Sequence, residues 1–347
     1  MTAPHETPAD RIALSARAGL PARTEPVAGG GPSRRASLGR RSALGLLGLA
    51  PVAALAACSD SDPLAEDSSQ SAGGSDGGGG GATGALVVGS QAYYSNEIIA
   101  ELFAQAIETT GTQVERQYQI GQREVYMPEL ESGAIDVLPE YTGNLLQFYD
   151  KEAAAASPDE VAQALAEALP EALRALPYAA ATDQDSYTTT SAFAQENSLT
   201  SLADLAGVKD LKIAANSEFE TRPYGPEGLK KIYGADVSLV PVEDSGGPLT
   251  VKALVDGDVQ LADIYSADPA IAKNSLVTLE DPESMVLPQN VVPIVSSRID
   301  EKAAAAIKAV TDALSTEELI ALNTQSVDEQ KASAEIATAW LQAKGLA

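Results

Sequence analysis

The stretch Ile135–Asn144, IDVLPEYTGN, joins a short apolar run to a tyrosine that stands between a proline and a glycine. Ile135–Leu138 predicts a buried strand, and Pro139 is expected to end it because proline has no amide proton for the sheet. Tyr141 then lies at the lip of the strand, where Pro139 and Gly143 restrict the backbone on either side. Such a tyrosine either faces a ligand or covers the core with its hydroxyl in water.

The segments before and after this stretch alternate between strand and helix patterns. Strands are predicted over Leu86–Gly89 and Thr112–Ile120, and helices over Ser95–Thr109 and Arg123–Ser132, with Ser95 as the N-cap of the first helix. Strands that alternate with helices predict a parallel sheet with helices on both faces. Ala153–Leu176 is rich in alanine and is expected to be helical, with an interruption at Pro170.

A second set of alternating segments follows. Its strands are predicted over Tyr187–Phe193, Leu211–Ala215, Val237–Val242 and Val259–Ile264, and its helices over Leu202–Leu205, Gly225–Tyr233 and Leu249–Val255. The chain then returns through Leu276–Leu279 and Asn290–Ser296 to two terminal helices, Glu301–Leu314 and Asp328–Ala343. We therefore expect two α/β lobes, 86–186 with 267–347 and 187–266, which share a ligand crevice and are joined by crossovers near Asp185–Tyr187 and Tyr265–Asp268.

The first 85 residues have the composition of an export signal and a tether. Two arginine pairs precede an apolar run, Leu44–Ala57, and Leu55-Ala56-Ala57-Cys58 has the form of a lipoprotein cleavage site. We expect 1–57 to be a signal of the twin-arginine or general secretory kind, with Cys58 as the lipidated first residue of the mature chain. The segment 58–85 is rich in Ser, Asp and Gly, which is typical of a flexible tether. The alternative is a plain cleaved signal with an incidental cysteine.

Composition excludes several classes of function. The first 57 residues hold seven of the 23 basic and three of the 49 acidic residues, so the mature chain keeps 16 and 46 and has a formal charge of −30. That charge excludes nucleic acid as a partner. The only histidine is His5, so the mature chain lacks the residue that Ser-His-Asp catalysis and common zinc sites need. We expect a binding protein without catalytic residues, metal or cofactor.

Several segments resemble the substrate-binding proteins of osmoprotectant ABC importers, which bind glycine betaine, choline or proline betaine. They are GSQAYYSNEIIAELFAQAIE, REVYMPELESGAIDVLPEYTG, DQDSY, NSEFETRP with GLKKIYG, and ADIYSADPAI. The resemblance covers nearly all of 86–347. It implies a two-lobed clamp of the periplasmic-binding-protein type II class, with a quaternary ammonium ligand in a cage of tyrosines and ABC permease subunits as partners. The protein is expected to be a monomer, lipid-anchored on the extracytoplasmic face of the cell membrane.

The resemblance also implies which residues bind the ligand. They are Tyr141, Tyr187 and Tyr265 for the cage, Glu218 and Arg222 on the second lobe, and Gln91, Asp185 and Asn144 as polar contacts. An arginine fork matches the carboxylate of a betaine, so Arg222 is expected to hold that end. Glu218 and Arg222 also have the spacing of a surface helix pair, and Asp185 has the alternative role of stabilising the crossover. Tyr224 and Tyr93 are candidates for a fourth cage residue.

Three functions remain open on the sequence. The first is delivery of glycine betaine, choline or a related betaine to a permease. The second is a sensory lipoprotein for a betaine-like ligand such as ergothioneine or carnitine. Ala267 and Asn144 depart from the usual pattern of the cage segments, which leaves such a bulkier betaine open as the ligand. The third is an enzyme on the same scaffold, against which the missing histidine argues.

Overall fold

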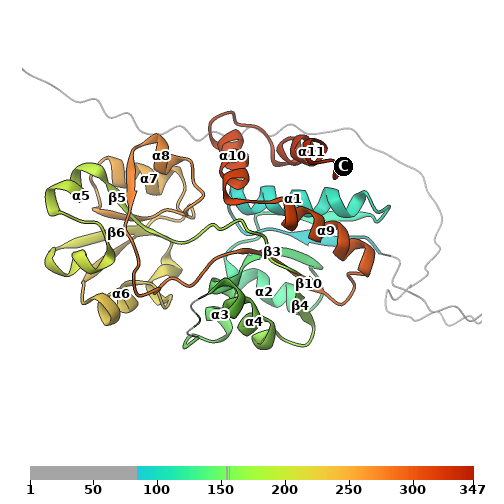
Figure 1. Cartoon of the computed structure of the whole chain (residues 1–347), viewed down its shortest axis with the longest axis horizontal. Helices are drawn as coiled ribbons and strands as arrows, with labels where there is room; N and C mark the ends of the chain where they lie inside the picture. The colour runs from blue at the N-terminus through green and yellow to red at the C-terminus, as the bar shows by residue number, and fades with distance from the viewer. Residues whose placement is uncertain (1–83, 154, 156) are drawn as a thin grey trace, which may run out of the picture. The chain divides into compact units, whose positions relative to one another are not determined.

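The computed structural model describes residues 84–153, 155 and 157–347 (Figure 1). The predicted signal, Cys58 and nearly all of the predicted tether lie outside these residues. Within them the strands form two sheets of five strands each, and helices cover both faces of each sheet. The prediction of an α/β chain with two lobes is confirmed.

The first sheet has the strand order β2-β1-β3-β10-β4. Its strands are β1 (Leu86–Gly89), β2 (Val114–Gln117), β3 (Val137–Tyr141), β4 (Leu173–Ala175) and β10 (Val291–Ser296). β1 pairs in parallel with β2 and β3, whereas β10 runs antiparallel to both β3 and β4. Four strands therefore share one direction, and the reversed strand β10 is the one that returns from the second lobe.

The second sheet repeats this arrangement in the order β7-β6-β8-β5-β9. Its strands are β5 (Tyr187–Thr190), β6 (Leu211–Ala215), β7 (Val237–Pro241), β8 (Leu261–Asp263) and β9 (Leu276–Thr278). Here β5, the strand that enters from the first lobe, is the reversed one. Each sheet therefore has a point where the strand order reverses, beside β1 and beside β6, and such points are where α/β folds bind ligands.

Two helical layers enclose the first sheet (Figure 1). The layers consist of α1 (Tyr94–Glu108), α9 (Glu301–Ala313), α10 (Thr316–Val327) and α11 (Ser333–Lys344) on one face, and α2 (Arg123–Glu131), α3 (Thr142–Tyr149) and α4 (Pro158–Ala168) on the other. α1 is central to the first layer, since Ile99, Leu102 and Phe103 are fully buried there. Burial of each such side chain contributes about 1.5–3 kcal/mol.

The second sheet is enclosed in the same way by shorter elements. They are α5 (Ser191–Asn197), η1 (Leu202–Gly207), η2 (Ser217–Thr221) and α6 (Pro226–Tyr233) around one apolar cluster, and α7 (Pro248–Val255) and α8 (Ala270–Lys273) around the other. The two lobes thus have separate hydrophobic cores. This separation allows one lobe to move against the other without unpacking either core.

Four predictions of local structure are wrong. Tyr93 is the N-cap of α1. Ser95 lies inside the first turn, and its hydroxyl donates to Asp183. The segment predicted as helix over Ala153–Leu176 ends in the strand β4. The terminal helix predicted from Asp328 begins at Ser333, and α10, which precedes it, was not predicted.

The fourth wrong prediction concerns Pro139, which does not end its strand. β3 continues through it to Tyr141, and Pro139 stands opposite Pro293 of β10 in the antiparallel register. Neither ring nitrogen can donate a hydrogen bond, so the sheet tolerates both prolines where they face each other. The carbonyl of Pro139 is used instead by a side chain of α1, since Asn96 Nδ2 donates to it at 3.0 Å.

The border between the lobes also differs from the prediction on the C-terminal side. We expected 267–347 to belong to the first lobe, but Leu276–Thr278 forms β9 at the edge of the second sheet. The chain approaches the first lobe at 265–268, returns to the second sheet, and reaches β10 through 280–290. The expected crossover at Asp185–Tyr187 does lead from the first sheet into β5.

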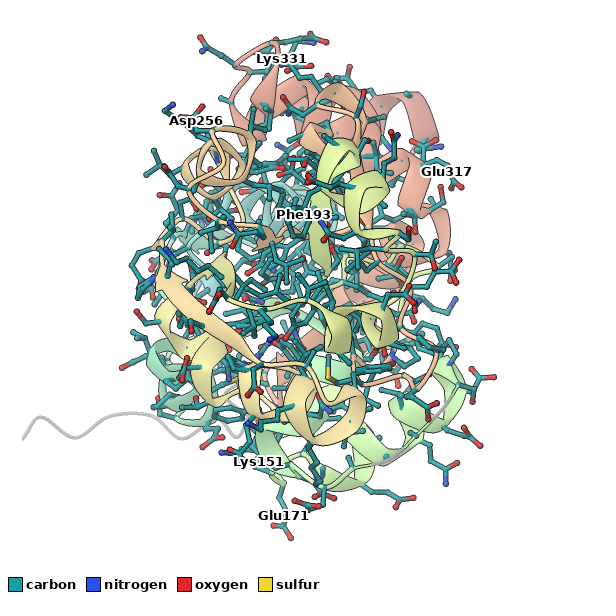
Figure 2. All side chains as sticks on the ribbon, turned by 90° about the vertical axis from the view of Figure 1, so that its left-hand side faces the viewer. Lys151, Glu171, Phe193, Asp256, Glu317 and Lys331 are labelled. Carbon is teal, nitrogen blue, oxygen red and sulfur yellow. The ribbon has the colours of Figure 1, made fainter. Side chains whose placement is uncertain are left out.

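Many charged side chains lie on the outside of the described chain. Figure 2 shows Lys151, Glu171, Asp256 and Glu317 at the rim of the view, and all four are exposed. None of the helices within 84–153, 155 and 157–347 combines the length and the apolar character that a membrane span requires.

Candidate functional site

The PEYTG segment, Pro139–Gly143, connects the end of β3 with α2 and with the chain that returns from the second lobe. Glu140 is fully buried and holds Arg123 of α2 in a two-pronged ion pair, with distances of 2.8 Å from Nε and 2.9 Å from Nη2. The Tyr126 hydroxyl donates to the same carboxylate. Such an arrangement satisfies the buried charges and fixes the arginine, because a planar guanidinium matches a carboxylate at two points.

Thr142 and Gly143, the last two residues of the segment, contact the chain that returns from the second lobe. Thr142 Oγ1 donates to the carbonyl of Pro288 at 2.9 Å and accepts from the amide of Asn290 at 3.1 Å. A Cβ on Gly143 would lie 2.7 Å from both Leu287 Cβ and the carbonyl oxygen of Pro288. Only glycine allows this approach, which explains its place after Tyr-Thr.

Tyr141 is the inner member of a row of three tyrosines. It is buried, and the Tyr93 hydroxyl donates to its hydroxyl at 2.6 Å. The Tyr93 ring in turn meets the Tyr265 ring edge to face, with the centroids 5.2 Å apart. Tyr265, which follows β8, is the member of the row that is partly exposed. Tyr141 therefore holds the outer ring in position through Tyr93.

A matching row of aromatic rings lies in the second lobe. The Tyr187 hydroxyl donates to the carbonyl of Tyr224 at 2.8 Å, and its ring lies 5.7 Å from that of Phe219. Phe219 in turn contacts the Tyr224 ring at 5.9 Å. Tyr187 thus supports Phe219 and Tyr224 in the way that Tyr141 supports Tyr265.

The outer rings of both rows line one small cavity, which we call the central cavity. Its walls are Gln91, Gln122, Arg123, Asn144, Asp185, Asn216, Glu218, Phe219, Arg222, Tyr224, Asp263 and Tyr265. These residues follow β1, β3, β6 and β8 or lie close to them, so the cavity sits at the two points where the strand order reverses. Its volume is about 30 Å³.

Three carboxylates in this wall have no basic partner among the described residues. Asp185 accepts from Asn144 Nδ2 at 2.6 Å and hydrogen-bonds the carboxyl of Asp263, which also accepts from the amide of Ser186 at 3.1 Å. Glu218 accepts from Asn216 Nδ2 at 3.1 Å. Burial, together with the neighbouring Asp185, raises the pKa of Asp263 well above its usual value. An entering cation would relieve this accumulation of negative charge.

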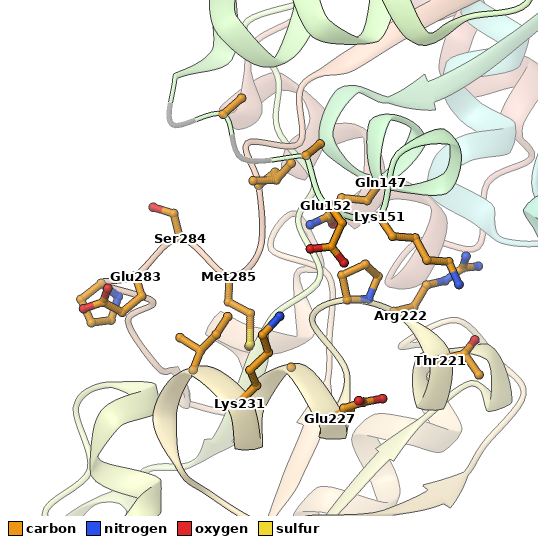
Figure 3. A pocket seen from close by; sticks show the side chains of 17 residues that line it. Gln147, Lys151, Glu152, Thr221, Arg222, Glu227, Lys231, Glu283, Ser284 and Met285 are labelled. Atoms are coloured by element: carbon orange, nitrogen blue, oxygen red, sulfur yellow. The ribbon is translucent and has the colours of Figure 1, made fainter.

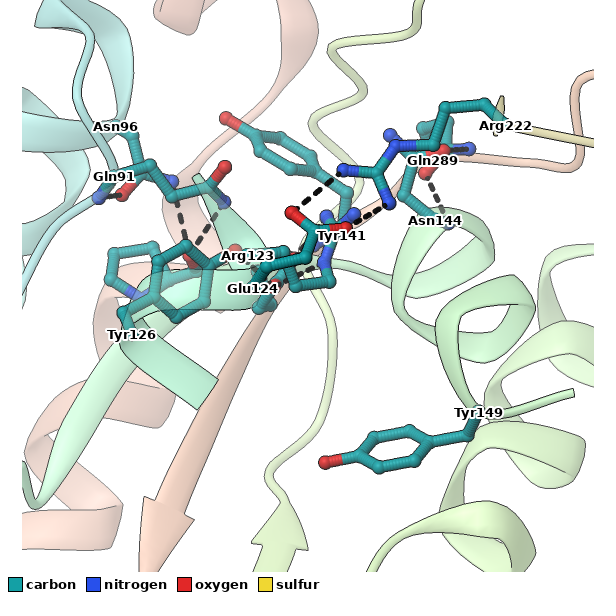
Figure 4. A network of polar contacts seen from close by, with 12 residues as sticks. Gln91, Asn96, Arg123, Glu124, Tyr126, Tyr141, Asn144, Tyr149, Arg222 and Gln289 are labelled. Atoms are coloured by element: carbon teal, nitrogen blue, oxygen red, sulfur yellow. Dashed lines mark hydrogen bonds and ion pairs between the residues drawn. The ribbon is translucent and has the colours of Figure 1, made fainter. Parts of the chain in front are cut away.

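Arg222 connects the two lobes at the edge of the central cavity (Figure 4). Its guanidinium reaches Glu124 of α2, with Nη1 at 2.9 Å and Nη2 at 3.4 Å from the two carboxylate oxygens. The alternative of a surface pair between Arg222 and Glu218 is wrong, because Glu218 turns to Asn216 instead. Gln122 adds a second contact between the lobes, from Nε2 to Ser245 Oγ at 3.3 Å.

Asp183 stabilises the crossover between the two lobes through hydrogen bonds. It is buried, accepts from the amide of Ala267 at 2.9 Å, and accepts from the hydroxyl of Ser95 at 3.3 Å. The amide of Gln184 beside it donates to Ser266 Oγ at 2.8 Å. Burial raises the pKa of Asp183 to about 7. The carboxyl therefore ties α1 to the segment after β8 at the point where the lobes meet.

The structure brings six of the eight predicted ligand residues to one cavity. They are Gln91, Asn144, Asp185, Glu218, Arg222 and Tyr265. Tyr141 and Tyr187 stand behind that wall, and Tyr224, a candidate for the fourth ring, is part of it. Asp263 and Phe219 were missed, although both lie inside quoted segments, and so were Gln122, Arg123 and Asn216.

A family of transport proteins matches nearly all of the described part of this chain. The profile of the substrate-binding domain of ABC-type glycine betaine transport systems, OpuAC, matches residues 84–343. The chain belongs to this family. The family consists of extracytoplasmic binding components of ABC importers, so the predictions of such a binding protein and of no enzymatic activity are confirmed.

Relatives of the glycine betaine family agree in sequence and in fold. The glycine betaine-binding protein YehZ of Escherichia coli strain K12 is 26% identical over 211 residues, which is 57% of this chain and 69% of that protein. The crystal structure of a glycine betaine/carnitine/choline ABC transporter protein has a TM-score of 0.62 at 22% identity, over 75% of this chain and 99% of that one. The structure of apo YehZ has a TM-score of 0.56 at 25% identity, over 76% and 99%. The predicted clamp fold is confirmed.

Proposed function

We propose that this member of the glycine betaine family captures a quaternary ammonium compound in the central cavity and delivers it to the permease subunits of an ABC importer. Choline, glycine betaine and related betaines are the candidate ligands. The observation that carries the proposal is the convergence of Tyr224, Tyr265 and three carboxyl groups, which have no basic partner in the described part of the chain, on one cavity at the strand ends of both lobes.

The chemistry of the walls suits such a ligand. A trimethylammonium group is charged but has no N–H, so carboxylates attract it without forming hydrogen bonds. The faces of Tyr224 and Tyr265 offer negative charge density and apolar contact together, worth about 0.5–2 kcal/mol each. In this proposal Tyr141 and Tyr187 position the cage rings, and Gln91 and Asn144 provide polar contacts to the rest of the ligand.

Binding requires the lobes to move apart. The central cavity holds about 30 Å³, which is roughly the share of one water molecule in the liquid and less than a trimethylammonium group needs. The ion pair between Arg222 and Glu124 and the contact between Gln122 and Ser245 are the links that opening breaks. The separate cores of the two lobes favour such a hinge motion.

The attachment to the membrane is proposed on the sequence alone. Leu55-Ala56-Ala57-Cys58 and the following Ser/Asp/Gly-rich segment support a chain anchored through lipid on Cys58, which works as a monomer outside the cytoplasm. Cys58→Ser is expected to yield a protein that is released from the membrane or left unprocessed. If the variant has the mature size and stays in the membrane fraction, the lipid anchor is contradicted. The proposal for the ligand site does not depend on this result.

A thermal-shift panel tests the function. The purified protein is heated with choline, glycine betaine, proline betaine, carnitine and ergothioneine, and with unmethylated amino acids as controls. A ligand at about 100 times its dissociation constant stabilises the folded state by about 2.7 kcal/mol. We expect a shift with at least one trimethylammonium compound and none with glycine. A shift with unmethylated amino acids alone would refute the proposal.

A further inference from the structure

A second hollow, which we call the side compartment, adjoins the central cavity. It has a volume of about 130 Å³, and it shares Asn144, Arg222 and Tyr224 with the walls of the central cavity. It opens in turn toward a larger outer cavity of about 720 Å³ between α3 and α6, with which it shares Gln147, Lys151 and Arg222 (Figure 3). The side compartment therefore lies directly beside the central cavity, with these shared residues at the border between them.

The two hollows differ in the sign of their unpaired charge. In the central cavity Arg123 is neutralised by Glu140 and Arg222 by Glu124, so that the charge left over comes from Glu218 and from the Asp185–Asp263 pair, which shares one proton in its mutual hydrogen bond. In the side compartment Arg222 and Glu124 cancel each other, and the charge left over is that of Lys151. The exposed lysine forms no ion pair or hydrogen bond with any residue that the structure describes. The cleft is thus negative at its inner end and positive beside it.

Gln147 gives the side compartment an unused polar group. Its side chain is buried at 6% exposure, and its Oε1 has no hydrogen-bond partner among the described residues. A half-turn of the amide brings Nε2 to the same place, so Gln147 can offer a donor or an acceptor. A buried amide without a partner is unfavourable, which indicates that a polar group is meant to meet it. Figure 3 shows Gln147 and Lys151 on the same side of the cleft, across from α6.

We propose that the natural ligand is an elongated zwitterion, whose trimethylammonium group lies in the central cavity and whose carboxylate lies in the side compartment between Lys151, Gln147 and Arg222. The inference deepens the proposed function and rests on it. Lys151 Nζ, Gln147 Nε2 and the guanidinium of Arg222 form a set of donors that suits a carboxylate. Phe148 and Pro223 line the same compartment and offer apolar contact to the methylene groups between the two charges.

The proposal favours a ligand whose two charges are far apart. Glycine betaine has a single methylene between its charges, so both ends stay within the central cavity. The ligand must therefore pass Asn144 and Tyr224, the residues that both hollows share, before its carboxylate meets Lys151. We therefore expect a long spacer, of three carbons as in 4-(trimethylammonio)butyrate with or without a hydroxyl group, to suit the two hollows better than a spacer of one carbon.

Titration calorimetry with a homologous series tests the inference. The probes are trimethylammonium carboxylates with one, two and three methylene groups, and choline as the probe without a carboxylate. We expect the three-carbon acid to bind most tightly to the wild type. Lys151→Met should weaken the binding of that acid by about twofold to fivefold, the effect of one exposed charge, and change the binding of choline by less than twofold.

Lys231→Met is the matched control, because Lys231 lines the outer cavity but not the side compartment. It should leave the whole series unchanged. Gln147→Leu provides a second variant and should also weaken the three-carbon acid more than choline. Equal weakening of all probes by Lys151→Met, or tighter binding of the one-carbon acid to the wild type, would overturn the inference. Failure of the wild type to bind any trimethylammonium probe would instead refute the proposed function.

Discussion

Replacing Asp183 by asparagine changes how the stability of the protein depends on pH. In the folded chain burial keeps this carboxyl protonated up to a pKa of about 7, whereas its ordinary value is 3.8. Folding therefore takes up a proton between these values, and stability falls as the pH rises from about 4 to 7. A pKa difference of about three corresponds to on the order of 4 kcal/mol in the free energy of unfolding. The folded state has lost all of this stability above pH 7. Asparagine is neutral throughout and removes this loss.

The hydrogen bonds of Asp183 survive the change. Asparagine Oδ1 can accept from the amide of Ala267, and Nδ2 can donate to the hydroxyl of Ser95, so the variant keeps both contacts. Urea denaturation at pH 4.5 and pH 8 measures the effect. We expect Asp183→Asn to match the wild type within about 1 kcal/mol at pH 4.5 and to exceed it by several kcal/mol at pH 8. Asp312→Asn, on the exposed surface of α9, controls for the loss of one carboxylate. Equal pH dependence in Asp183→Asn and wild type would refute the reasoning.

Three further variants test the site. Tyr265→Ala should weaken the binding of a trimethylammonium ligand by on the order of 1–3 kcal/mol in calorimetry, whereas Tyr265→Phe should keep most of the affinity, because the ring face makes the contact. Equal binding by the alanine variant and the wild type would contradict this. Tyr141→Phe removes the hydrogen bond with Tyr93 and should lower the free energy of unfolding by about 1 kcal/mol with less than a threefold change in affinity. Glu124→Gln frees Arg222 and should lower the free energy of unfolding by at most about 1 kcal/mol. It should also increase the radius of gyration of the unliganded protein in X-ray scattering, and an unchanged radius would contradict the role of this ion pair in holding the lobes together.

Much of the fold could be predicted from the sequence because local patterns determine it. Alternating strand and helix segments such as Leu211–Ala215 and Gly225–Tyr233 lie almost where their periodicity puts them. The errors occur where tertiary contacts override local preference. Pro139 stays in a strand because Pro293 faces it, and Leu276–Thr278 joins the second sheet through long-range pairing with β5, which periodicity does not encode.

The residues of the site were easier to predict than their roles. The quoted segments contain Tyr141, Tyr187 and Tyr265, but no sequence pattern tells which ring faces the ligand, as Tyr265 does, and which supports it, as Tyr141 does. The partner of Arg222 could not be predicted either, because Glu124 lies 98 positions away and meets it only when the lobes come together. Lys151 had no signal at all, since a surface lysine after a helix is ordinary until the cleft beside it is known.

The central claim is that the cavity between Tyr224, Tyr265, Asp185, Glu218 and Asp263 takes a quaternary ammonium cation. The most direct measurement compares choline with 3,3-dimethylbutanol, in which a neutral tert-butyl group replaces the trimethylammonium, by titration calorimetry on the same protein. The shape and apolar area stay the same and only the charge is removed. We expect choline to bind at least about tenfold more tightly, a difference of about 1.4 kcal/mol. Equal affinities would contradict the claim, because the rings and carboxylates would then contribute nothing to recognition of the charge.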